Sequence, residues 1–231
     1  MSKNSLKENI IAIIPARKGS KGIINKNIKK FCGKPLIYWT IKNALDSKEI
    51  SNVFVSSDSK KILDISEKYG ATPIERPKKI SGDNSSSESA WKHTLSMMEE
   101  DCKVDLVIGM QATSPIRGKK DISNALKIFK SNGLDSLMTV TEVEDNFLWE
   151  EKNNKLHSVN YDYKNRLIRQ KIKKKYLENG SFYIFKPKIL EKYNNRLGGK
   201  IGIHIMEKYK SFQIDNISDF KLCESIMKGH K

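Results

Sequence analysis

The chain has 231 residues, enough for one α/β domain, and its 38% apolar residues support a buried core. The net charge of +16 leaves nucleic acid, an anionic membrane or an acidic ligand open as partners. Only six of the 43 cations are arginines, the residue favoured for bidentate recognition of bases and phosphates. A lysine-rich solvated surface is therefore favoured over a nucleic-acid-binding face.

Cysteine and histidine patterns exclude two further classes. The three cysteines are odd in number and form no CxxC pair, and the four histidines show no metal-ligand spacing. This argues against a disulfide framework and against a zinc site. The apolar run at residues 10–14 is too short for a signal-peptide core or a membrane span. We therefore expect a cytoplasmic protein that does not enter a membrane.

Short apolar runs alternate with amphipathic segments along most of the chain. The predicted strands are residues 10–14, 53–55, 71–75, 106–110, 136–140, 181–185 and 201–206. The predicted helices are residues 35–45, 60–69, 88–100, 119–130 and 218–227. This alternation predicts right-handed βαβ crossovers and a doubly wound, mostly parallel α/β sheet of the Rossmann-like kind.

The regular alternation stops between residues 142 and 180. This stretch is polar, rich in Lys and Asn, and carries isolated aromatic residues. A long irregular segment inside a compact domain is usually functional. We interpret it as an inserted arm or lid, with a disordered insertion as the alternative.

The strongest local signal is the polar loop that follows the first predicted strand. Gly19 and Gly22 allow backbone amides to approach an anion, and Arg17, Lys21 and Lys26 supply positive charge. Open α/β sheets bind ligands at this edge. The loop has neither the GxxxxGK[ST] nor the GxGxxG spacing, and taken alone an ordinary turn remains the alternative.

Collinear motifs extend this signal over nearly the whole chain. They are IIPARKGSKGIINKN (13–27), SSD (56–58), ERPKKISGDNSSS (75–87), QATSPIR (111–117), RQ (169–170), ENGSFYIF (178–185), LGGKIG (197–202) and IDNISDF (214–220). Together they resemble the acylneuraminate cytidylyltransferases, also called CMP-sialic acid synthetases. The resemblance implies a single cytidylyltransferase domain over residues 1–231 with a Rossmann-like nucleotidyltransferase fold.

The resemblance also implies the residues of a nucleotide site. Those that would bind the nucleotide are Arg17, Ser20, Lys21, Asn27, Arg76 and Ser87. Those that would act on the reaction are Arg17, Lys21, Lys26 and Arg169. In this scheme Lys26 and Asn27 lie beside the reacting α-phosphate, and Arg76 contacts the cytosine ring. Without the resemblance, Arg76 is interpreted as a surface arginine and Ser87 as part of a helix N-cap.

On the sugar side, the resemblance implies contacts from Gln111, Arg169 and Asn179. Arg169 would reach from the arm into the pocket of a second subunit, so a homodimer is expected. Asp215 is the expected ligand of Mg²⁺, a cation that favours carboxylates and substrate phosphates. The chain has Gln213 where the family often has a second acidic residue, which implies a weaker metal site. Asp58 and Asp219 are auxiliary candidates, each equally well explained as a cap.

The implied reaction joins CTP to a nine-carbon 2-keto-3-deoxy sugar acid, giving a CMP-sugar and pyrophosphate. Three alternatives stay open at this point. One is a Kdo-type cytidylyltransferase; another is a nucleotide-binding protein that has lost catalysis, marked by Gln213; the third is a nucleic-acid-binding protein that uses the charge of +16. Product formation from CTP separates the first from the other two, and CTP binding without turnover separates the second from the third.

Overall fold

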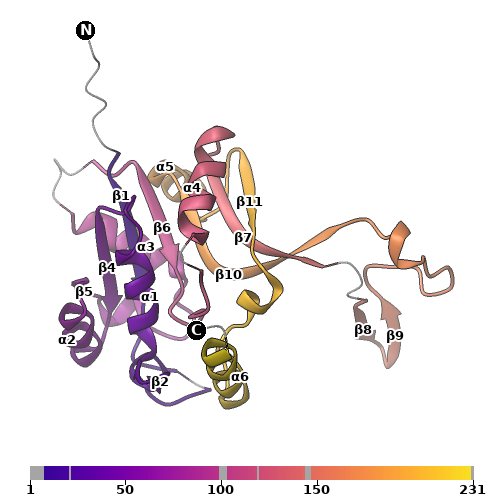
Figure 1. Cartoon of the computed structure of the whole chain (residues 1–231), viewed down its shortest axis with the longest axis horizontal. Coiled ribbons are helices and arrows are strands. Elements are labelled where there is room, and N and C mark those ends of the chain that lie inside the picture. Colours follow the sequence, from indigo (N-terminus) through magenta and orange to yellow (C-terminus); the bar gives the residue numbers. More distant parts are fainter. Residues whose placement is uncertain (1–7, 21, 99–102, 119, 144–146, 230–231) are drawn as a thin grey trace, which may run out of the picture.

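The computed structural model describes residues 8–20, 22–98, 103–118, 120–143 and 147–229. Within these residues, seven strands form one sheet in the order β11-β7-β10-β6-β1-β4-β5 (Figure 1). They are β1 (Ile10–Pro15), β4 (Asn52–Ser57), β5 (Thr72–Glu75), β6 (Leu106–Met110), β7 (Ser136–Val143), β10 (Lys175–Phe185) and β11 (Ile201–Ile205). Neighbouring strands are parallel except for β10, which is antiparallel to β6 and β7. The predicted mostly parallel sheet is confirmed.

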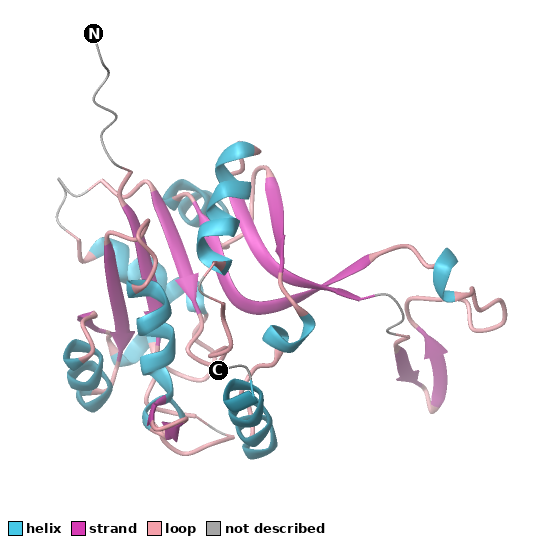
Figure 2. Ribbon diagram, in the orientation of Figure 1, coloured by secondary structure: helices cyan, strands magenta, loops and turns pink. Residues whose placement is uncertain are grey.

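Helices cover both faces of this sheet because its central strands are apolar on both sides (Figure 2). In β1, Ile10, Ala12 and Ile14 face one layer, and Ile11 and Ile13 face the other. The first layer holds α1 (Leu36–Leu45), α2 (Lys60–Lys68) and α4 (Asp121–Ser131). The second holds α3 (Ser87–Ser96) and α5 (Pro187–Tyr193). The doubly wound architecture follows directly from this two-sided burial.

A third apolar cluster supports the edge of the sheet where the parallel strands end. The C-terminal helix α6 (Ile217–Gly229) inserts Phe220 against Phe31, which lies in the small hairpin of β2 (Lys30–Phe31) and β3 (Lys34–Pro35). Ile23, from the loop after β1, and Ile214, from the segment before α6, are buried in the same cluster. This cluster fixes the loop after β1 against the C-terminal segment.

The segment 142–180 is an arm that extends away from the sheet (Figure 1). Its interpretation as irregular throughout is wrong: β7 continues to Val143, β10 begins at Lys175, and a hairpin pairs β8 (Trp149–Lys152) with β9 (Lys155–Ser158). Asn153 and Asn154 form the hairpin turn with φ of 52° and 57°, a conformation that asparagine tolerates better than most residues. The arm therefore contains paired strands, although residues 159–174 belong to no strand.

The helices differ from their predicted ranges in three places. The helix expected over residues 88–100 ends at Ser96, although residues 99–102 lie outside the described part of the chain. The helix expected over residues 119–130 begins at Asp121, with residue 119 likewise outside. Helix α5 was not predicted; it begins with Pro187 at a position where proline suits a helix start.

Candidate functional site

A pocket of about 180 Å³ lies where β1 and β6 end, at the edge of the sheet expected to bind ligands. Seven of the predicted site residues line it: Arg17, Ser20, Lys26, Asn27, Arg76, Ser87 and Gln111. They come from the loop after β1, the segment after β5, the start of α3 and the end of β6. Residues more than 90 positions apart in the sequence therefore meet in one cavity.

The charge of this pocket suits a polyanion. Its described lining contains the three cations Arg17, Lys26 and Arg76 and no carboxylate. A carboxylate does lie at its mouth, because Asp83 Oδ1 accepts a hydrogen bond of 2.6 Å from Arg17 Nη1. Both partners of this ion pair are partly exposed, so it contributes little to stability. Arg17 can therefore exchange this carboxylate for a ligand phosphate at small cost.

The loop after β1 is held by close contacts with the C-terminal segment. A Cβ atom built on Gly22 would lie 1.9 Å from the carbonyl oxygen of Asp215, so only glycine fits there. Lys26 Nζ donates to the carbonyl oxygen of Ile214 at 2.7 Å and lies 3.4 Å from Asp215 Oδ1. Gly22 was expected to let backbone amides approach an anion. In the structure it lets the loop pack closely against the backbone of Asp215.

Two further bonds fix the course of the same loop. Asn27 Nδ2 donates to the carbonyl oxygen of Arg17 at 3.0 Å, and the amide of Lys18 donates to Asp58 Oδ1 at 2.7 Å. Asp58 therefore acts as a support of the loop. Lys21, predicted to bind phosphate and to act in the reaction, lies outside the described residues.

Arg76 is buried in the pocket wall, with only 5% of its surface exposed. Burial lowers the pKa of its guanidinium, and Asp58 opposes this effect while Arg17 adds to it. Within the described part of the chain its Nε finds no hydrogen-bond partner. Buried donors are nearly always paired, so this group is suited to a ligand acceptor. Its interpretation as a surface arginine is wrong.

The start of α3 forms the opposite wall of the pocket. Ser86 is the N-cap of this helix, and its hydroxyl accepts a hydrogen bond of 3.2 Å from the amide of Ser89. Ser87 is the first helical residue and lines the pocket, so the capping role falls on its neighbour. The first-turn amides and the helix dipole favour negative charge at this end.

Gln111 follows β6 and is connected to β10 by its backbone. Its amide donates to the carbonyl oxygen of Ser181 at 3.1 Å, and both carbonyl oxygens, of Gln111 and of Ser181, accept hydrogen bonds from Arg117. The sequence reasoning assigned Arg117 no role, although it ends the motif QATSPIR. The sequence did offer a signal for a special role of Arg117, because only six of the 43 cations in this chain are arginines.

Asn179 does not line the pocket and is buried two residues before Ser181, the backbone partner of Gln111. Its exposure is 2%, Thr139 Oγ1 donates to its Oδ1 at 2.6 Å, and its Nδ2 lies 3.5 Å from Ser211 Oγ. Gly180 follows with a φ of 61°, and the pairing of β10 with β7 shifts register between Glu178 and Tyr183, so β10 is irregular here; we call this irregularity the turn at Asn179. The side chain of Asn179 shapes this turn, and its predicted contact with a sugar stays a prediction.

Gln213 is explained by the same turn. Its Nε2 donates to the carbonyl oxygen of Asn179 at 2.8 Å, and a Cβ on Gly180 would lie 2.8 Å from that nitrogen. A carboxylate at position 213 could not donate this hydrogen bond. The amide at position 213 therefore joins the segment before α6 to β10.

Asp215 offers an exposed carboxylate next to the loop after β1. Its side chain is 75% exposed and lies beside Lys26, whereas Asp219 Oδ2 accepts from the amides of Asp215 and Asn216 as a helix cap. Among the described residues, no three His, Cys, Asp or Glu side chains gather closely enough to hold a metal ion. One carboxylate fits Mg²⁺ when substrate phosphates supply the other ligands.

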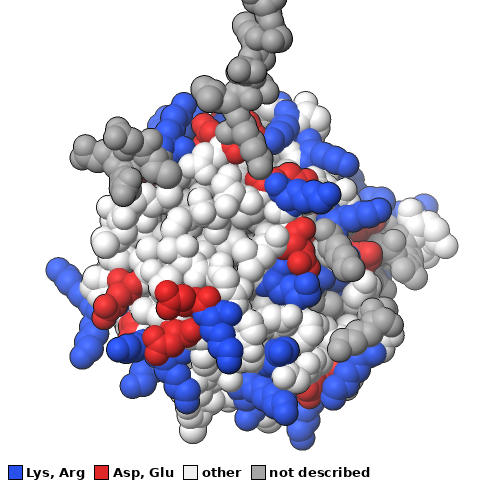
Figure 3. Space-filling model, turned by 60° about the vertical axis from the view of Figure 1, so that its left-hand side comes forward, with Lys and Arg blue, Asp and Glu red and all other residues white. Residues whose placement is uncertain are grey.

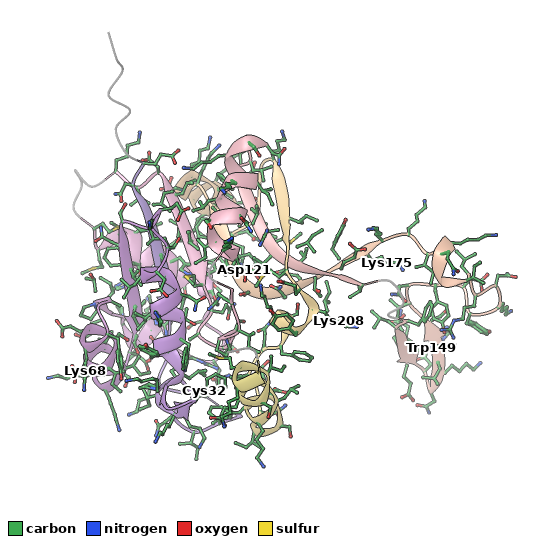
Figure 4. The ribbon with its side chains drawn as sticks, in the orientation of Figure 1. Cys32, Lys68, Asp121, Trp149, Lys175 and Lys208 are labelled. Atoms are coloured by element: carbon green, nitrogen blue, oxygen red, sulfur yellow. The ribbon has the colours of Figure 1, made fainter. Side chains whose placement is uncertain are left out.

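Arg169 belongs to a short 3₁₀ turn, Arg169–Lys171, within the arm. The structure does not describe its side chain. The arm carries this turn away from the sheet (Figure 1). Figure 4 places Lys175 in the stem of the arm and Trp149 in its distal hairpin. The predicted action of Arg169 on a second subunit stays a prediction.

Lysines and arginines on the face drawn in Figure 3 are scattered and interspersed with acidic residues. No continuous basic stripe crosses that face, as a groove for a nucleic-acid backbone would require. Within the described residues, no helix combines the length and the apolar character needed to cross a bilayer. The fold and the pocket together define a Rossmann-like protein with a cationic pocket at the carboxyl edge of its sheet, where such folds bind nucleotides.

Comparison with known proteins defines the family. The cytidylyltransferase family model matches residues 11–230, so the chain belongs to the cytidylyltransferase family and is a nucleotidyltransferase. N-acylneuraminate cytidylyltransferase A of Danio rerio is 34% identical over 226 residues, which cover 96% of this chain and 51% of that protein. Pseudaminic acid cytidylyltransferase of Campylobacter jejuni is 30% identical over 224 residues, covering 94% of this chain and 96% of that protein.

A solved structure agrees with the fold. The chain resembles CMP:2-keto-3-deoxy-manno-octonic acid synthetase complexed with CTP, with a TM-score of 0.73 over 97% of this chain and all of that one. At 15% identity this likeness shows the fold alone. The chain spans about half the length of the Danio rerio relative. The predicted family, fold and enzyme class are confirmed.

Proposed function

We propose that this enzyme transfers CMP from CTP to the anomeric hydroxyl of a nine-carbon 2-keto-3-deoxy sugar acid and releases pyrophosphate. One observation carries the proposal: a single pocket gathers seven residues that the family motifs assign to nucleotide, reaction and sugar. The names of the Danio rerio and Campylobacter jejuni relatives support a sialic-type acid as acceptor. CTP is made inside cells, so the proposal includes a cytoplasmic location.

The residues divide the work by their chemistry. Arg17 and Lys26 bear positive charge where the triphosphate enters, and the start of α3 adds oriented amides. The unpaired Nε of Arg76 offers a donor to the carbonyl and ring-nitrogen acceptors of cytosine. Gln111 extends into the pocket from the end of β6, on the side of the turn at Asn179. Positioning and charge stabilisation then supply most of the catalysis.

Mg²⁺ is the proposed cofactor, held by Asp215 together with triphosphate oxygens. When bound, it would supply positive charge to the attacked and leaving phosphates. The position of Lys26 between this carboxylate and the pocket supports the proposal, because loop cation and metal ligand then act on one anion. Chelation of divalent metal should abolish product formation, and added Mg²⁺ should restore it.

The decisive assay offers CTP and Mg²⁺ with a panel of acids: N-acetylneuraminate, its deaminated relative, legionaminate, pseudaminate and the eight-carbon acid Kdo. Mass spectrometry detects the CMP-sugar and a coupled assay detects pyrophosphate. A nonulosonic product supports the proposal, and turnover with Kdo alone refutes it in favour of the Kdo-type enzyme. CTP binding without any product supports a non-catalytic nucleotide-binding protein. Retention on heparin without CTP binding supports a nucleic-acid-binding protein.

A homodimer formed through the arm is part of the proposal. Apolar side chains of the arm are unusually exposed for such a thin element: Leu148 55%, Leu156 68%, Val159 53%, Tyr163 54%, Leu167 55% and Ile168 61%. Such surface is typical of contact with another protein, and a second copy could bring Arg169 to the partner's pocket.

Light scattering and mixing of variants test this arrangement. A Leu156→Lys substitution should shift the mass from dimer to monomer, whereas Lys152→Glu, an exposed change in the same hairpin, should not. If Arg169 acts across the interface, inactive Arg169→Ala and Lys26→Ala proteins should recover turnover when mixed. Lack of recovery in an exchanging dimer would place Arg169 outside the partner's site.

A further inference from the structure

The guanidinium of Arg117 connects three parts of the molecule beneath the sugar side of the pocket. Its Nε donates to Ser181 Oγ at 2.9 Å, and its Nη1 donates to Thr40 Oγ1 at 3.0 Å. Its Nη2 donates to two carbonyl oxygens, that of Gln111 at 2.6 Å and that of Ser181 at 2.5 Å. One planar group therefore joins the loop after β6, strand β10 and helix α1.

This bonding fixes Gln111 relative to the turn at Asn179. The amide of Gln111 already donates to the carbonyl oxygen of Ser181, and Arg117 holds the carbonyl oxygens of both residues together. Ser181 is two residues after Asn179, and its amide donates to Asn179 Oδ1 at 3.1 Å. The pocket residue Gln111 and the turn thus share one support. Lysine could not replace it, since an ammonium lacks the planar fork of donors.

Arg117 also brings a positive charge that its surroundings do not neutralise. Among the described residues, no carboxylate lies within ion-pair distance of its guanidinium. The nearest acidic influence is Asp121, whose oxygens accept from the amide of Gly118 and from Lys210. Desolvation lowers the pKa of Arg117 to about 9, so the group stays charged at neutral pH. Asp121 is the first residue of α4 and is labelled in Figure 4.

We propose that Arg117 is a positioning residue for the acidic sugar: it holds Gln111 and the 179–181 turn in place and adds a desolvated positive charge below the acceptor carboxylate. The inference rests on the proposed transfer to a sugar acid. Arg117 does not line the pocket around the loop after β1, so it acts on the sugar through Gln111 and the turn. Removing Arg117 should therefore raise the KM for the sugar acid far more than the KM for CTP.

Steady-state kinetics with each substrate varied in turn test this role. Arg117→Lys keeps the charge but loses the fork, and the KM for the sugar acid should rise about tenfold while that for CTP changes less than about threefold. Arg117→Met loses both, and kcat/KM for the sugar acid should fall about 100-fold. If Arg117 only stabilised the fold, its replacement would raise the KM values for both substrates alike. Equal effects on the two KM values would therefore overturn the proposal.

If the Arg117 variants do not fold, the Thr40→Val variant tests the same role, because Thr40 Oγ1 accepts a hydrogen bond from Arg117. This substitution removes one acceptor of the guanidinium and also the donor of a longer bond, 3.4 Å from Thr40 Oγ1 to the carbonyl oxygen of Gln111, so the KM for the sugar acid should rise about threefold. Thr94→Val is its matched control, because Thr94 is also fully buried but bonds only within α3, to the carbonyl oxygen of Ala90. Equal sugar KM values for these two variants would refute the role of Arg117. A wild-type enzyme without product from any acid would instead refute the proposed function, and this inference with it.

Discussion

The loop after β1 packs against the C-terminal segment at Gly22. Replacing Gly22 with alanine tests whether this contact sets the catalytic geometry. The new Cβ would lie 1.9 Å from the carbonyl oxygen and 3.1 Å from the carbonyl carbon of Asp215. Both atoms belong to the backbone, so neither can rotate away as a side chain would. Relief requires the loop and the segment to separate by about 1 Å or more, the scale of misplacement that costs about 100-fold in rate.

Such a separation would break specific contacts. Lys26 Nζ donates to the carbonyl oxygen of Ile214 at 2.7 Å and lies 3.4 Å from Asp215 Oδ1, and both interactions cross the same gap. We expect kcat/KM to fall about 100-fold in Gly22→Ala. The free energy of unfolding should fall by about 1–3 kcal/mol, as for other overpacked sites. At this chain length, each kcal/mol lowers the unfolding temperature by about 2–4 °C.

Gly19→Ala is the matched control for stability. It lies in the same loop, but a Cβ there meets no protein atom within 4 Å. The ligand-free Gly19→Ala protein should unfold at the wild-type temperature, measured by calorimetry without CTP. Pyrophosphate release reports the activity of Gly22→Ala. If Gly22→Ala kept both wild-type turnover and wild-type stability, the contact with Asp215 would not hold the loop.

Three further substitutions probe separate features. Arg76→Met removes a buried donor that awaits a ligand, so calorimetric titration should show CTP affinity reduced about tenfold or more while the unfolding temperature does not fall; unchanged affinity would exclude contact with the base. Burial alone would raise the pKa of Asp121, but His204, the Gly118 amide and Lys210 together lower it below 3.8. Its contribution to stability is therefore present above that pH and is lost on acidification, so urea unfolding should show Asp121→Asn less stable than wild type near neutrality and converging with it in acid; a gap independent of pH would contradict this. Gln213→Glu replaces the donor to the carbonyl oxygen of Asn179 with an acceptor, and urea unfolding at neutral pH should reveal a loss of about 1–3 kcal/mol; an equally stable variant would show that this bond is dispensable.

The fold could be predicted because its local patterns agree with its topology. Buried runs such as residues 10–14 and 106–110 are apolar on both faces, and each is followed by a polar loop and an amphipathic helix. The direction of β10 was not predictable in this way. Its buried half, residues 181–185, is as continuously apolar as the parallel strands, and orientation is set by the path of the arm that precedes it.

The hairpin of the arm illustrates a signal that was present but obscured. Two adjacent asparagines separate two short runs, which is a turn preference with a physical basis in their tolerance of positive φ. The chain is so rich in asparagine and lysine that this pair did not stand out. The exposed character of the flanking strands, which have no apolar alternation facing a core of their own, also hid them.

The site was predicted residue by residue from motifs, but its supports were not. Arg76 looked like a surface cation because burial depends on which chain segments cover it. Arg117 and Gln213 act through carbonyl oxygens of residues distant in sequence, and no local pattern marks such partners. Gln213 shows this limit, because the sequence indicated only a missing carboxylate and gave no sign that its amide donates to the carbonyl oxygen of Asn179.

The packing of the loop after β1 against the C-terminal segment also determines the surroundings of Asp215, the one carboxylate expected to bind a metal ion. Gly22 and Lys26 keep Asp215 close to the loop after β1, so the carboxylate lies beside the loop cations. A triphosphate held by those cations would present oxygens to a metal at Asp215, and these oxygens can replace the charge that Gln213 lacks. We therefore expect metal affinity to depend strongly on bound CTP. Tight Mg²⁺ binding to the free protein would show instead that the protein supplies ligands beyond Asp215.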